Sequence, residues 1–474
     1  MTGNARWLAL TVLCLGDLMT VLDSTIVNVA LPSIRDDLGF SETSLAWVMN
    51  AYLLTFGGFL LLAGRLGDLF GARKLFLSGL VLFTVASLAC GLSTSQEALI
   101  ISRGIQGVGG ALVAAVALAL VMNLFTEPAE RAKAMGIFGF VLSGGGAAGV
   151  LAGGVLTDLL SWNWIFLVNI PLGIAVVALT LRLVPKVPGQ EGAGRLDLAG
   201  AGAVTGALVL AVYAIVNGNE AGWLGAQTLG LLAVAIGLFI AFLFVETRVA
   251  TPLVPLGLFR RRNVSAANGV AVLMAAALFG WFFLSALYMQ EVLGYEPLEV
   301  GLAYLPSMIL WGIASVAISD KLVLRYGFRT PIVVGMGLFF ISLLLFARAP
   351  VDGNFVIDIL PATLFIGLGG GITFNPLLLA AMGDVGPHES GLASGIVNTS
   401  FMMGGALGLA VLVSISDART ESLEATESAL NALNGGYQLA FLTGAIFAIL
   451  AAILAFTSVR PEARSTPREG ASPG

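Results

Sequence analysis

Three charged residues stand inside long apolar stretches of this 474-residue chain, where lipid would reject them. Asp17 and Asp23 lie in the first stretch, and Arg103 lies in a later one. Each charge inside a membrane-spanning helix costs at least about 2.5–3.5 kcal/mol, so such residues normally face a cavity or a partner. A carboxyl group in this setting can bind and release a proton, because apolar surroundings favour its neutral form and a nearby arginine favours its charged form. These residues are therefore candidates for proton coupling.

The spacing of the two carboxylates decides how they can work together. Six helical residues separate Asp17 from Asp23, which places the side chains about 120° apart around the helix and about 9 Å apart along it. They can border one cavity at different depths, but they do not form a tight pair. Either carboxylate could instead be a permanently hydrogen-bonded packing residue, and Arg103 could be a purely structural clamp.

The composition predicts the elements that must hold these charges. With 58% hydrophobic and only 11% charged residues, the chain is a membrane protein. Its apolar stretches are mostly close to the roughly 20 residues that a helix needs to cross a bilayer, and about fourteen are present. Alternating strand patterns are absent, so the expected fold is all-α. The 60 glycines indicate closely packed helices, because small residues let membrane helices approach each other.

The basic residues predict the orientation of the chain. Threading the spans with the N-terminus inside places nearly all of the 23 Lys and Arg residues in cytoplasmic loops, and leaves only Arg35, Arg348 and Arg419 outside. We therefore expect a multi-pass protein of the cell membrane with both termini in the cytoplasm.

Several partners and cofactors are not expected. The net charge of −5 is divided between two aqueous faces, and no basic patch for nucleic acid is present. Cys14 and Cys90 fall within apolar spans, which argues against a disulfide or metal site. A phosphate-binding loop for ATP is absent, so the expected energy source is a proton gradient rather than a cofactor.

A charged, glycine-broken loop separates two of the apolar stretches. It runs GRLGDLFGARK, with Gly64, Asp68, Gly71, Arg73 and Lys74 at its defining positions. Two glycines permit a tight turn. Asp68 can accept hydrogen bonds at a helix N-terminus, and the two basic residues can pair with acidic groups or anionic lipid. Alternatively, these charges only set the topology.

Two pairs of segments indicate duplicated halves. The segment around Gly327 resembles the loop around Gly71, 256 residues earlier, and Ile366–Gly371 resembles Ile105–Gly110, 261 residues earlier. Glycine-rich helices could also align through composition alone. The spacing predicts a six-helix bundle over residues 1–185, two extra spans and a cytoplasmic linker over 186–262, a second six-helix bundle over 263–459, and a disordered cytoplasmic tail over 460–474.

These motifs resemble a known family. The loop from Gly64 to Lys74 resembles the loop between spans 2 and 3 of major facilitator superfamily transporters. Leu22–Pro32 resembles the span 1 signature of the fourteen-span drug:proton antiporters, and Arg103–Gly110 resembles their span 4 motif. The resemblance implies that Asp23 is the proton and cation site, that Arg103 belongs to the proton-transfer network, and that the loop closes the cytoplasmic side in the outward-facing state. Asp17 lies outside the shared motif.

A glycine-rich fifth span resembles the antiporter motif of the same family. Its glycines include Gly145, Gly146, Gly149, Gly153 and Gly154. The family pattern usually has Gly-Pro pairs here, and this chain has Ala and Val in place of the prolines. A kink is less assured without proline, although the motif still favours export. Close packing between helices is the alternative.

The substrate is expected to be a lipophilic or cationic small molecule. Ring faces and a carboxylate can share the binding of organic cations, and the expected cavity residues are Asn28, Trp47, Asn50, Tyr52, Gln106, Trp281 and Asn375. The aromatic residues among them could equally face lipid. The resulting prediction is proton-coupled efflux of drugs or antibiotics by a monomer that is not an enzyme. A proton-coupled symporter that imports a metabolite, and a receptor that binds without transport, are the alternatives.

One segment outside the expected bundles has a pattern of its own. Ser416–Asn434 carries Glu421, Glu424 and Glu427 at three-residue spacing, which predicts an amphipathic extracellular helix. It could gate access, but a solvated loop is favoured over that role.

Overall fold

Long helices make up almost the whole protein. A computed structural model describes residues 3–125, 127–186, 196–249, 251–386 and 389–460, and none of these residues lies in a strand. Residues 461–474 of the predicted tail and residues 187–195 of the predicted linker region lie outside the described residues. The first half of the chain forms α1 (Gly3–Leu38), α2 (Glu42–Phe70), α3 (Ala72–Gly91), α4 (Gln96–Leu124), α5 (Pro128–Leu159), α6 (Trp164–Leu167), α7 (Asn169–Leu183), α8 (Leu198–Val216), α9 (Gly218–Ala221) and α10 (Ala226–Arg248).

The second half of the chain continues in the same way. Its elements are η1 (Leu256–Arg260), α11 (Arg262–Leu287), η2 (Tyr288–Val292), α12 (Pro297–Ile313), η3 (Ala314–Ile318), α13 (Ser319–Tyr326), α14 (Arg329–Phe346), η4 (Phe355–Ile359), α15 (Leu360–Gly383), α16 (Ser390–Glu424) and α17 (Ala429–Ser458). Of these, η2, η3 and η4 are π-helical turns within or beside longer helices.

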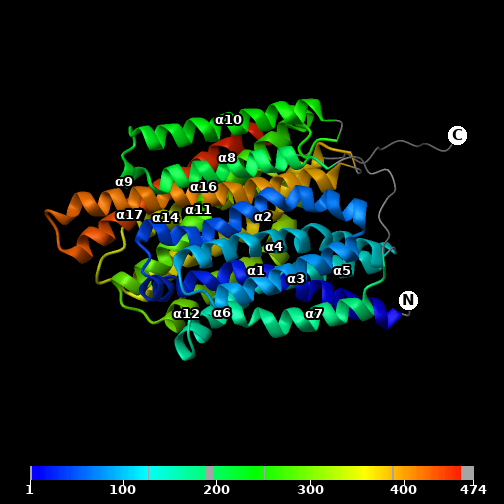
Figure 1. Ribbon diagram of the computed structural model, residues 1–474, viewed down its shortest axis with the longest axis horizontal. Coiled ribbons are helices and arrows are strands. Elements are labelled where there is room, and N and C mark those ends of the chain that lie inside the picture. Colours follow the sequence, from blue (N-terminus) through cyan, green and yellow to red (C-terminus); the bar gives the residue numbers. More distant parts are fainter. Residues whose placement is uncertain (1–2, 126, 187–195, 250, 387–388, 461–474) are drawn as a thin grey trace.

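Fourteen helical segments of the described residues are long and apolar enough to cross a membrane, which confirms the all-α membrane fold predicted from the sequence. The separate extracellular helix predicted over Ser416–Asn434 is wrong. Instead, α16 continues to Glu424 and α17 begins at Ala429, so two spans extend beyond the others and meet in a short turn (Figure 1). Glu421 and Glu424 lie on the extension of α16, and Glu427 lies in the turn that follows. The polar spacing of these residues did not indicate that the apolar helix continues into this segment.

The helices form two groups that meet along two seams. Within the first group, α4 packs against α1, α2 and α3, and α1 packs against α5 and α7. Within the second, α11 packs against α16 and α17, and α14 packs against α15 and α17. The groups meet where α2 contacts α16 and where α5 contacts α12. The extra spans α8 and α10 pack on each other, with α8 against α2 and α16, and α10 runs along one edge of Figure 1.

Corresponding turns in the two groups each have a glycine with a positive φ angle. Gly71, between α2 and α3, has φ of 92°, and Gly327, between α13 and α14, has φ of 73°. Only glycine adopts these angles without strain. The loop around Gly327 therefore shares with the loop around Gly71 the need for a glycine at the turn, although the ψ angles of the two glycines are 129° for Gly71 and −177° for Gly327.

The protein has two ends in the direction of its helices. We call the end where α1 begins and α17 ends the terminal face, and the other end the distal face. Toward the distal face α5 and α12 touch, because a Cβ atom on Gly154 would lie 2.8 Å from the Pro297 carbonyl oxygen and one on Gly301 would lie 2.8 Å from the Val150 carbonyl oxygen.

Toward the terminal face the same two helices separate. Gly136 and Gly139 lie on the side of α5 that α12 covers near Gly154, yet nothing lies within 4 Å of the Cβ position of either. Gly312, on the matching side of α12, is equally uncovered. The protein is therefore closed between these helices at the distal face and open between them toward the terminal face.

Close glycine contacts predict which small residues the fold requires. A Cβ atom on Gly109 of α4 would lie 2.6 Å from the backbone nitrogen of Phe83 on α3. We expect Gly109→Ala to push these helices apart and to lower stability by about 1–3 kcal/mol. The measurement is the apparent melting temperature of the purified protein in detergent.

Gly139→Ala is the matched control, because that position is open and alanine favours helix. It should leave the melting temperature unchanged or slightly raised. Equal melting temperatures for the two variants would show that the α3–α4 contact does not limit packing.

Candidate functional site

An ion pair between α1 and α4 forms the centre of the candidate site. Arg103 Nη1 lies 2.5 Å from Asp23 Oδ2, and both side chains have no exposed surface. The structure therefore brings together two of the charges that the sequence singled out. Because each ion leaves water at a cost of several kcal/mol, the pair depends on further hydrogen bonds to its remaining groups. These bonds reach all of them except Arg103 Nη2, which is buried and has no hydrogen-bond partner among the described residues.

Two amide side chains complete the surroundings of Asp23. Asp23 Oδ1 accepts hydrogen bonds from Gln106 Nε2 at 2.7 Å and from Asn169 Nδ2 at 3.2 Å. Gln106 also accepts a hydrogen bond from Arg103 Nη1 at 2.6 Å and donates one to Ser87 Oγ at 2.9 Å. Four helices, α1, α3, α4 and α7, thus contribute to one network of fully buried polar side chains.

Arg103 has contacts that do not depend on Asp23. Its Nε donates to the Val48 carbonyl oxygen at 2.9 Å, and its guanidinium carbon lies 4.5 Å from the centre of the Tyr52 ring and 5.5 Å from that of Phe166. If Asp23 were protonated, the Val48 carbonyl and the Gln106 amide would still accept hydrogen bonds from Arg103. The arginine can therefore remain charged while the carboxylate gains and loses a proton.

Small residues on α4 allow this arrangement. A Cβ atom on Gly107 would lie 2.5 Å from the Tyr52 carbonyl oxygen, and one on Gly110 would lie 2.9 Å from Tyr52 Oη. This close approach of α2 and α4 brings Arg103 within reach of the Val48 carbonyl. The glycines of the span 4 motif therefore position the arginine rather than contact it.

Asp17 lies apart from the ion pair. It is nearly buried, and Thr20 Oγ1 donates to its carbonyl oxygen at 2.8 Å and to its Oδ1 at 3.4 Å. Tyr52 Oη donates to the Thr20 carbonyl oxygen at 3.3 Å. The two carboxylates are thus linked only indirectly, through Thr20, Tyr52 and the arginine over the Tyr52 ring, as expected for residues that do not form a tight pair.

The predicted cavity residues are dispersed. Gln106 belongs to the ion-pair network, and Tyr52 packs beneath Arg103. The others have the following surroundings: Asn28 donates to the Ser24 and Thr25 carbonyls, Trp47 lies against the Tyr213 ring, Trp281 is fully buried beside Tyr304 and Phe346, Asn375 donates to Ser315, and Asn50 is fully buried with no hydrogen-bond partner. Among the described residues, no hydrogen bond or ring contact joins any two of the seven.

The loop predicted to close the cytoplasmic side makes few contacts in this state. Asp68 is exposed, and no described residue donates a hydrogen bond to it. Lys74 is exposed, the Cβ position of Gly64 is open, and Arg73 Nη2 donates to the Leu181 carbonyl oxygen of α7 at 2.6 Å. The loop therefore does not bridge the two groups of helices while α5 and α12 are apart at this face.

The glycines of the fifth span serve two different contacts. Gly145, Gly149 and Gly153 face α1, where added Cβ atoms would lie 2.7 Å from Leu18 Cδ1, 2.9 Å from the Leu22 carbonyl oxygen and 2.5 Å from the Ile26 carbonyl oxygen. Gly154 faces α12, and Gly146 lies near Met308 of the same helix. The motif thus joins α5 to its own group on one side and to the other group on the second side.

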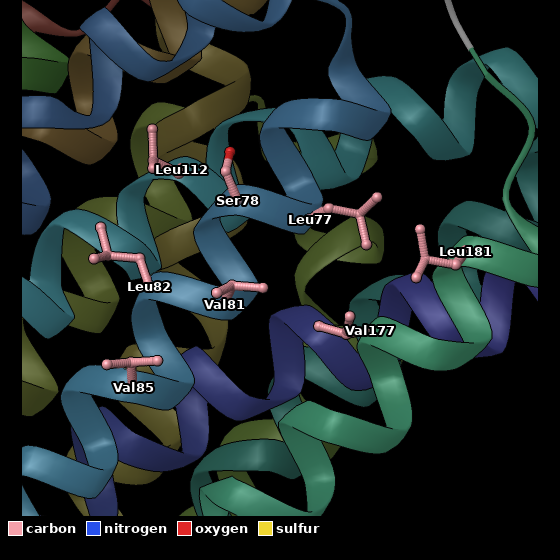
Figure 2. A pocket seen from close by; sticks show the side chains of 8 residues that line it. All are labelled: Leu77, Ser78, Val81, Leu82, Val85, Leu112, Val177 and Leu181. Atoms are coloured by element: carbon pink, nitrogen blue, oxygen red, sulfur yellow. The ribbon is translucent and has the colours of Figure 1, made fainter.

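An open apolar hollow lies beside the charged loop, because Leu181 and Ser78 in its lining bond to Arg73 and to the Lys74 carbonyl, but it includes no residue of the ion-pair network. It has a volume of about 650 Å³ and is lined by residues of α3, α4 and α7, several of which are exposed on the surface of the helix assembly: Leu77, Ser78, Val81, Leu82, Val85, Leu112, Val177 and Leu181 (Figure 2). The side chains are almost entirely aliphatic, so the hollow offers no group that could bind a proton or a charged substrate.

Sequence reasoning missed several members of the network. Asn169 and Phe166 come shortly after Trp162 and Trp164, which follow the fifth span in the sequence. Ser87 lies on α3, and Cys90 Sγ donates to Gln106 Oε1 at 3.7 Å. A buried polar residue in an apolar span is a signal for Asn169 and Ser87, but nothing in their spacing indicated that they would meet at Asp23.

Fourteen spans, two groups of helices and a buried ion pair define a polytopic membrane transporter. The chain belongs to the Major Facilitator Superfamily, whose family model matches residues 13–409. It is 38% identical to the puromycin resistance protein pur8 of Streptomyces alboniger, over 98% of this chain and 94% of that protein. It is also 38% identical to the cephamycin export protein CmcT of Amycolatopsis lactamdurans, over 97% of this chain and 93% of that protein.

Solved structures share the fold at low sequence identity. The peptide transporter PepTSo has a TM-score of 0.69 at 15% identity, with 94% of this chain and 96% of that chain covered. A bacterial homologue of the human lysosomal transporter Spinster, in an inward-facing and unoccupied conformation, has a TM-score of 0.65 at 16% identity, with 96% and 97% covered.

The buried pair predicts an asymmetry between its two members. Asp23→Leu leaves a buried arginine that cannot lose its charge, whereas Arg103→Met leaves a carboxylate that can take up a proton and keeps its amide donors. We expect Asp23→Leu to be destabilising by about 3–5 kcal/mol and Arg103→Met by less. The double variant should be more stable than Asp23→Leu alone. Apparent melting temperatures of the purified variants provide the comparison.

Asp158→Asn is the control, because this carboxylate is exposed at the end of α5. It should melt like the wild type. Single and double variants with identical losses would mean that the two charges do not depend on each other.

Proposed function

We propose that this protein exports lipophilic or cationic small molecules, antibiotics among them, across the cell membrane in exchange for protons. The buried pair of Asp23 and Arg103 is the observation that carries the proposal. The names of the relatives, which are resistance and export proteins for puromycin and cephamycin, support efflux. Transport would proceed by alternating access between the two groups of helices.

Proton exchange at Asp23 gives the ion pair a role in transport. A proton on Asp23 would remove the negative charge that holds Arg103 Nη1 and would leave the arginine with its Val48 and Gln106 acceptors. A cationic substrate would favour the charged carboxylate instead. Competition between proton and substrate for one site is the simplest way to couple their movements.

The terminal face would lie in the cytoplasm in this proposal. The distribution of Lys and Arg supports that orientation. With α5 and α12 apart at this face, the described state would be the one that takes up substrate from the cytoplasm. The loop around Asp68 would then engage the second group of helices only when the cytoplasmic side closes.

The driving force is sufficient for strong export. One proton that enters through about 100 mV and one pH unit releases about 2.3 and about 1.4 kcal/mol, respectively. For a neutral solute this corresponds to a concentration ratio of several hundred. For a monovalent cation exchanged with one proton, the voltage contribution cancels, and only the pH gradient remains.

The first test uses inverted membrane vesicles that are energised by respiration. Addition of ethidium, puromycin or lincomycin should partly collapse the pH gradient in wild-type vesicles, and Asp23→Asn should abolish the response. Asp158→Asn, which neutralises an exposed carboxylate of the same charge, should respond like the wild type. The readout is the fluorescence of a pH-gradient dye.

The alternative of a proton-coupled importer predicts the opposite vectorial result. Substrate would then accumulate in right-side-out vesicles with an acidic exterior. Such accumulation, or an Asp23→Asn variant that still responds in inverted vesicles, would overturn proton-coupled export through Asp23.

Asp17 is proposed as a second proton carrier. With two protons exchanged for one monovalent cation, one net charge crosses per cycle, and about 100 mV would change the ethidium gradient about fiftyfold at equilibrium. In proteoliposomes with a potassium diffusion potential, Asp17→Asn should lose this voltage dependence and keep its response to a pH gradient. Voltage dependence retained in Asp17→Asn would exclude Asp17 as the second carrier.

A further inference from the structure

The apolar hollow on α3, α4 and α7 is a groove in the lipid-facing surface of the first group of helices. Figure 2 shows its α3 residues following one another along that helix, with Val177 and Leu181 of α7 beside them. Val81 is 48% exposed, Val85 60% and Leu181 57%. All three helices belong to segments that are long and apolar enough to cross a membrane. The surroundings of the groove are therefore lipid chains rather than water.

The lining of the groove has no free hydrogen-bonding group. Ser78 is the one polar residue in this lining, and its Oγ donates to the Lys74 and Leu75 carbonyl oxygens at 3.0 Å each. A hydroxyl has a single donor, so that of Ser78 is occupied within its own helix. The groove therefore presents hydrocarbon to an occupant, which suits an acyl chain.

The groove has the depth of one leaflet. Val85 follows Lys74 by eleven residues, which is about 16 Å along α3. The hydrocarbon core of a bilayer is about 30 Å thick. Because α3 begins at the terminal face, the groove runs from that face to about the middle of the membrane. An acyl chain of the adjacent leaflet occupies the same depth.

Basic residues lie at the terminal end of the groove. Lys74 precedes Leu77 and Val81 by three and seven residues, so it lies on the same side of α3 as the lining. Arg73 is its neighbour in the chain, and Arg182 lies in the last turn of α7. None of the ion pairs among the described residues includes these three cations. They can therefore attract an anion at the edge of the membrane.

Arg73 is held in place by the backbone of the neighbouring helix. Its Nη2 donates to the Leu181 carbonyl oxygen at 2.6 Å, which joins the α3 and α7 walls of the groove. Its Nε is buried and has no hydrogen-bond partner among the described residues. A guanidinium has five N–H donors, so others remain for an acceptor. The first turn of α3 has no side-chain cap and adds positive potential at this end. A phosphate group matches both features.

We propose that this groove is a binding site for an anionic phospholipid of the leaflet at the terminal face. One acyl chain lies along α3 from Leu77 to Val85, and the headgroup phosphate contacts Arg73 and Lys74. The apolar wall selects a chain, and the cations select a negatively charged headgroup. This inference goes beyond the proposed function and depends on neither its substrate nor its proton coupling.

Native mass spectrometry of the full-length protein tests the choice of headgroup. Purified protein in detergent is titrated with phosphatidylglycerol or with phosphatidylcholine of identical acyl chains, and the dissociation constant of the first bound lipid is measured. The wild type should bind phosphatidylglycerol about tenfold more tightly, because two basic residues near a membrane surface each contribute about fivefold to anionic-lipid binding. Equal binding of the two lipids would mean that the groove accepts any membrane lipid, and would overturn the proposal.

Substitutions of the cations test their contact with the headgroup. Arg73→Gln and Lys74→Gln should each weaken phosphatidylglycerol binding about fivefold and leave phosphatidylcholine binding nearly unchanged. Lys321→Gln is the matched control, because Lys321 is also exposed and lies on α13, beside the corresponding turn at Gly327. It should bind phosphatidylglycerol like the wild type. Equal losses in all three variants would assign the preference to overall charge and contradict a site at the groove.

A substitution in the wall tests the position of the acyl chain. Val81→Trp places an indole in the groove and should weaken phosphatidylglycerol binding about tenfold, because the chain loses buried contact. Val334→Trp on α14 is the matched control, since this valine is 49% exposed. It should bind the lipid like the wild type. Both variants should melt like the wild type, which separates a loss of lipid from unfolding. Wild-type binding by Val81→Trp would show that the chain lies elsewhere and overturn the proposal.

Discussion

The cost of holding charge in a hydrocarbon layer governs the organisation of this protein. Asp23 and Arg103 are fully buried in the membrane-spanning region, and neither could remain charged there alone. Their stability depends on donors and acceptors from α1, α2, α3, α4 and α7 meeting at one point. Convergence of so many helices is possible only if their backbones come close, and glycines at the crossings of α4 with α2 and α3 make room for it. The packing of the first group of helices therefore follows from the requirement to satisfy one ion pair.

Glycine has a different effect on α5, which lies at the seam between the two groups. Gly145, Gly149 and Gly153 fix α5 against α1, where added Cβ atoms would meet the backbone or closely packed side chains. Gly154 lets α5 touch α12 at the distal face, while Gly136 and Gly139 leave the same side of α5 free near the terminal face. The glycine contacts with α1 continue along α5 from Gly145 to Gly153, whereas those with α12 do not extend to Gly136 and Gly139. Helix α5 is thus attached to one group and separable from the other.

The sequence predicted the parts of this structure that depend on local pattern. The all-α fold and the fourteen spans followed from the length of the apolar stretches, and Asp23 and Arg103 were singled out because they are charges inside such stretches. The position of Asn169 at Asp23 could not be predicted, because it depends on how α6 and α7 return toward α1. Tyr52 and Gln106 were expected in a cavity as polar or aromatic residues of apolar spans, and only the crossing of α2 and α4 shows that they contact Arg103. The extension of α16 was missed because polar residues mark the end of the membrane rather than the end of a helix.

The buried ion pair and a distal contact between the two groups, in which Arg35 Nη2 lies 2.9 Å from Glu291 Oε1, involve one continuous helix. Asp23 and Arg35 both lie on α1, twelve residues and about 18 Å apart along its axis. Pro32 lies between them and lacks the backbone N–H that would bond to the Asn28 carbonyl, so the helix is weakest between the two sites. The Val29 carbonyl in the same turn accepts the hydrogen bond from Gln290 of the second group. In the proposed exchange of protons, a change of charge at Asp23 would alter the contacts of α1 with α4 and α7, and Pro32 is the point at which the distal part of α1 would bend. The two sites would then communicate through α1 itself, without a chain of side chains across the protein.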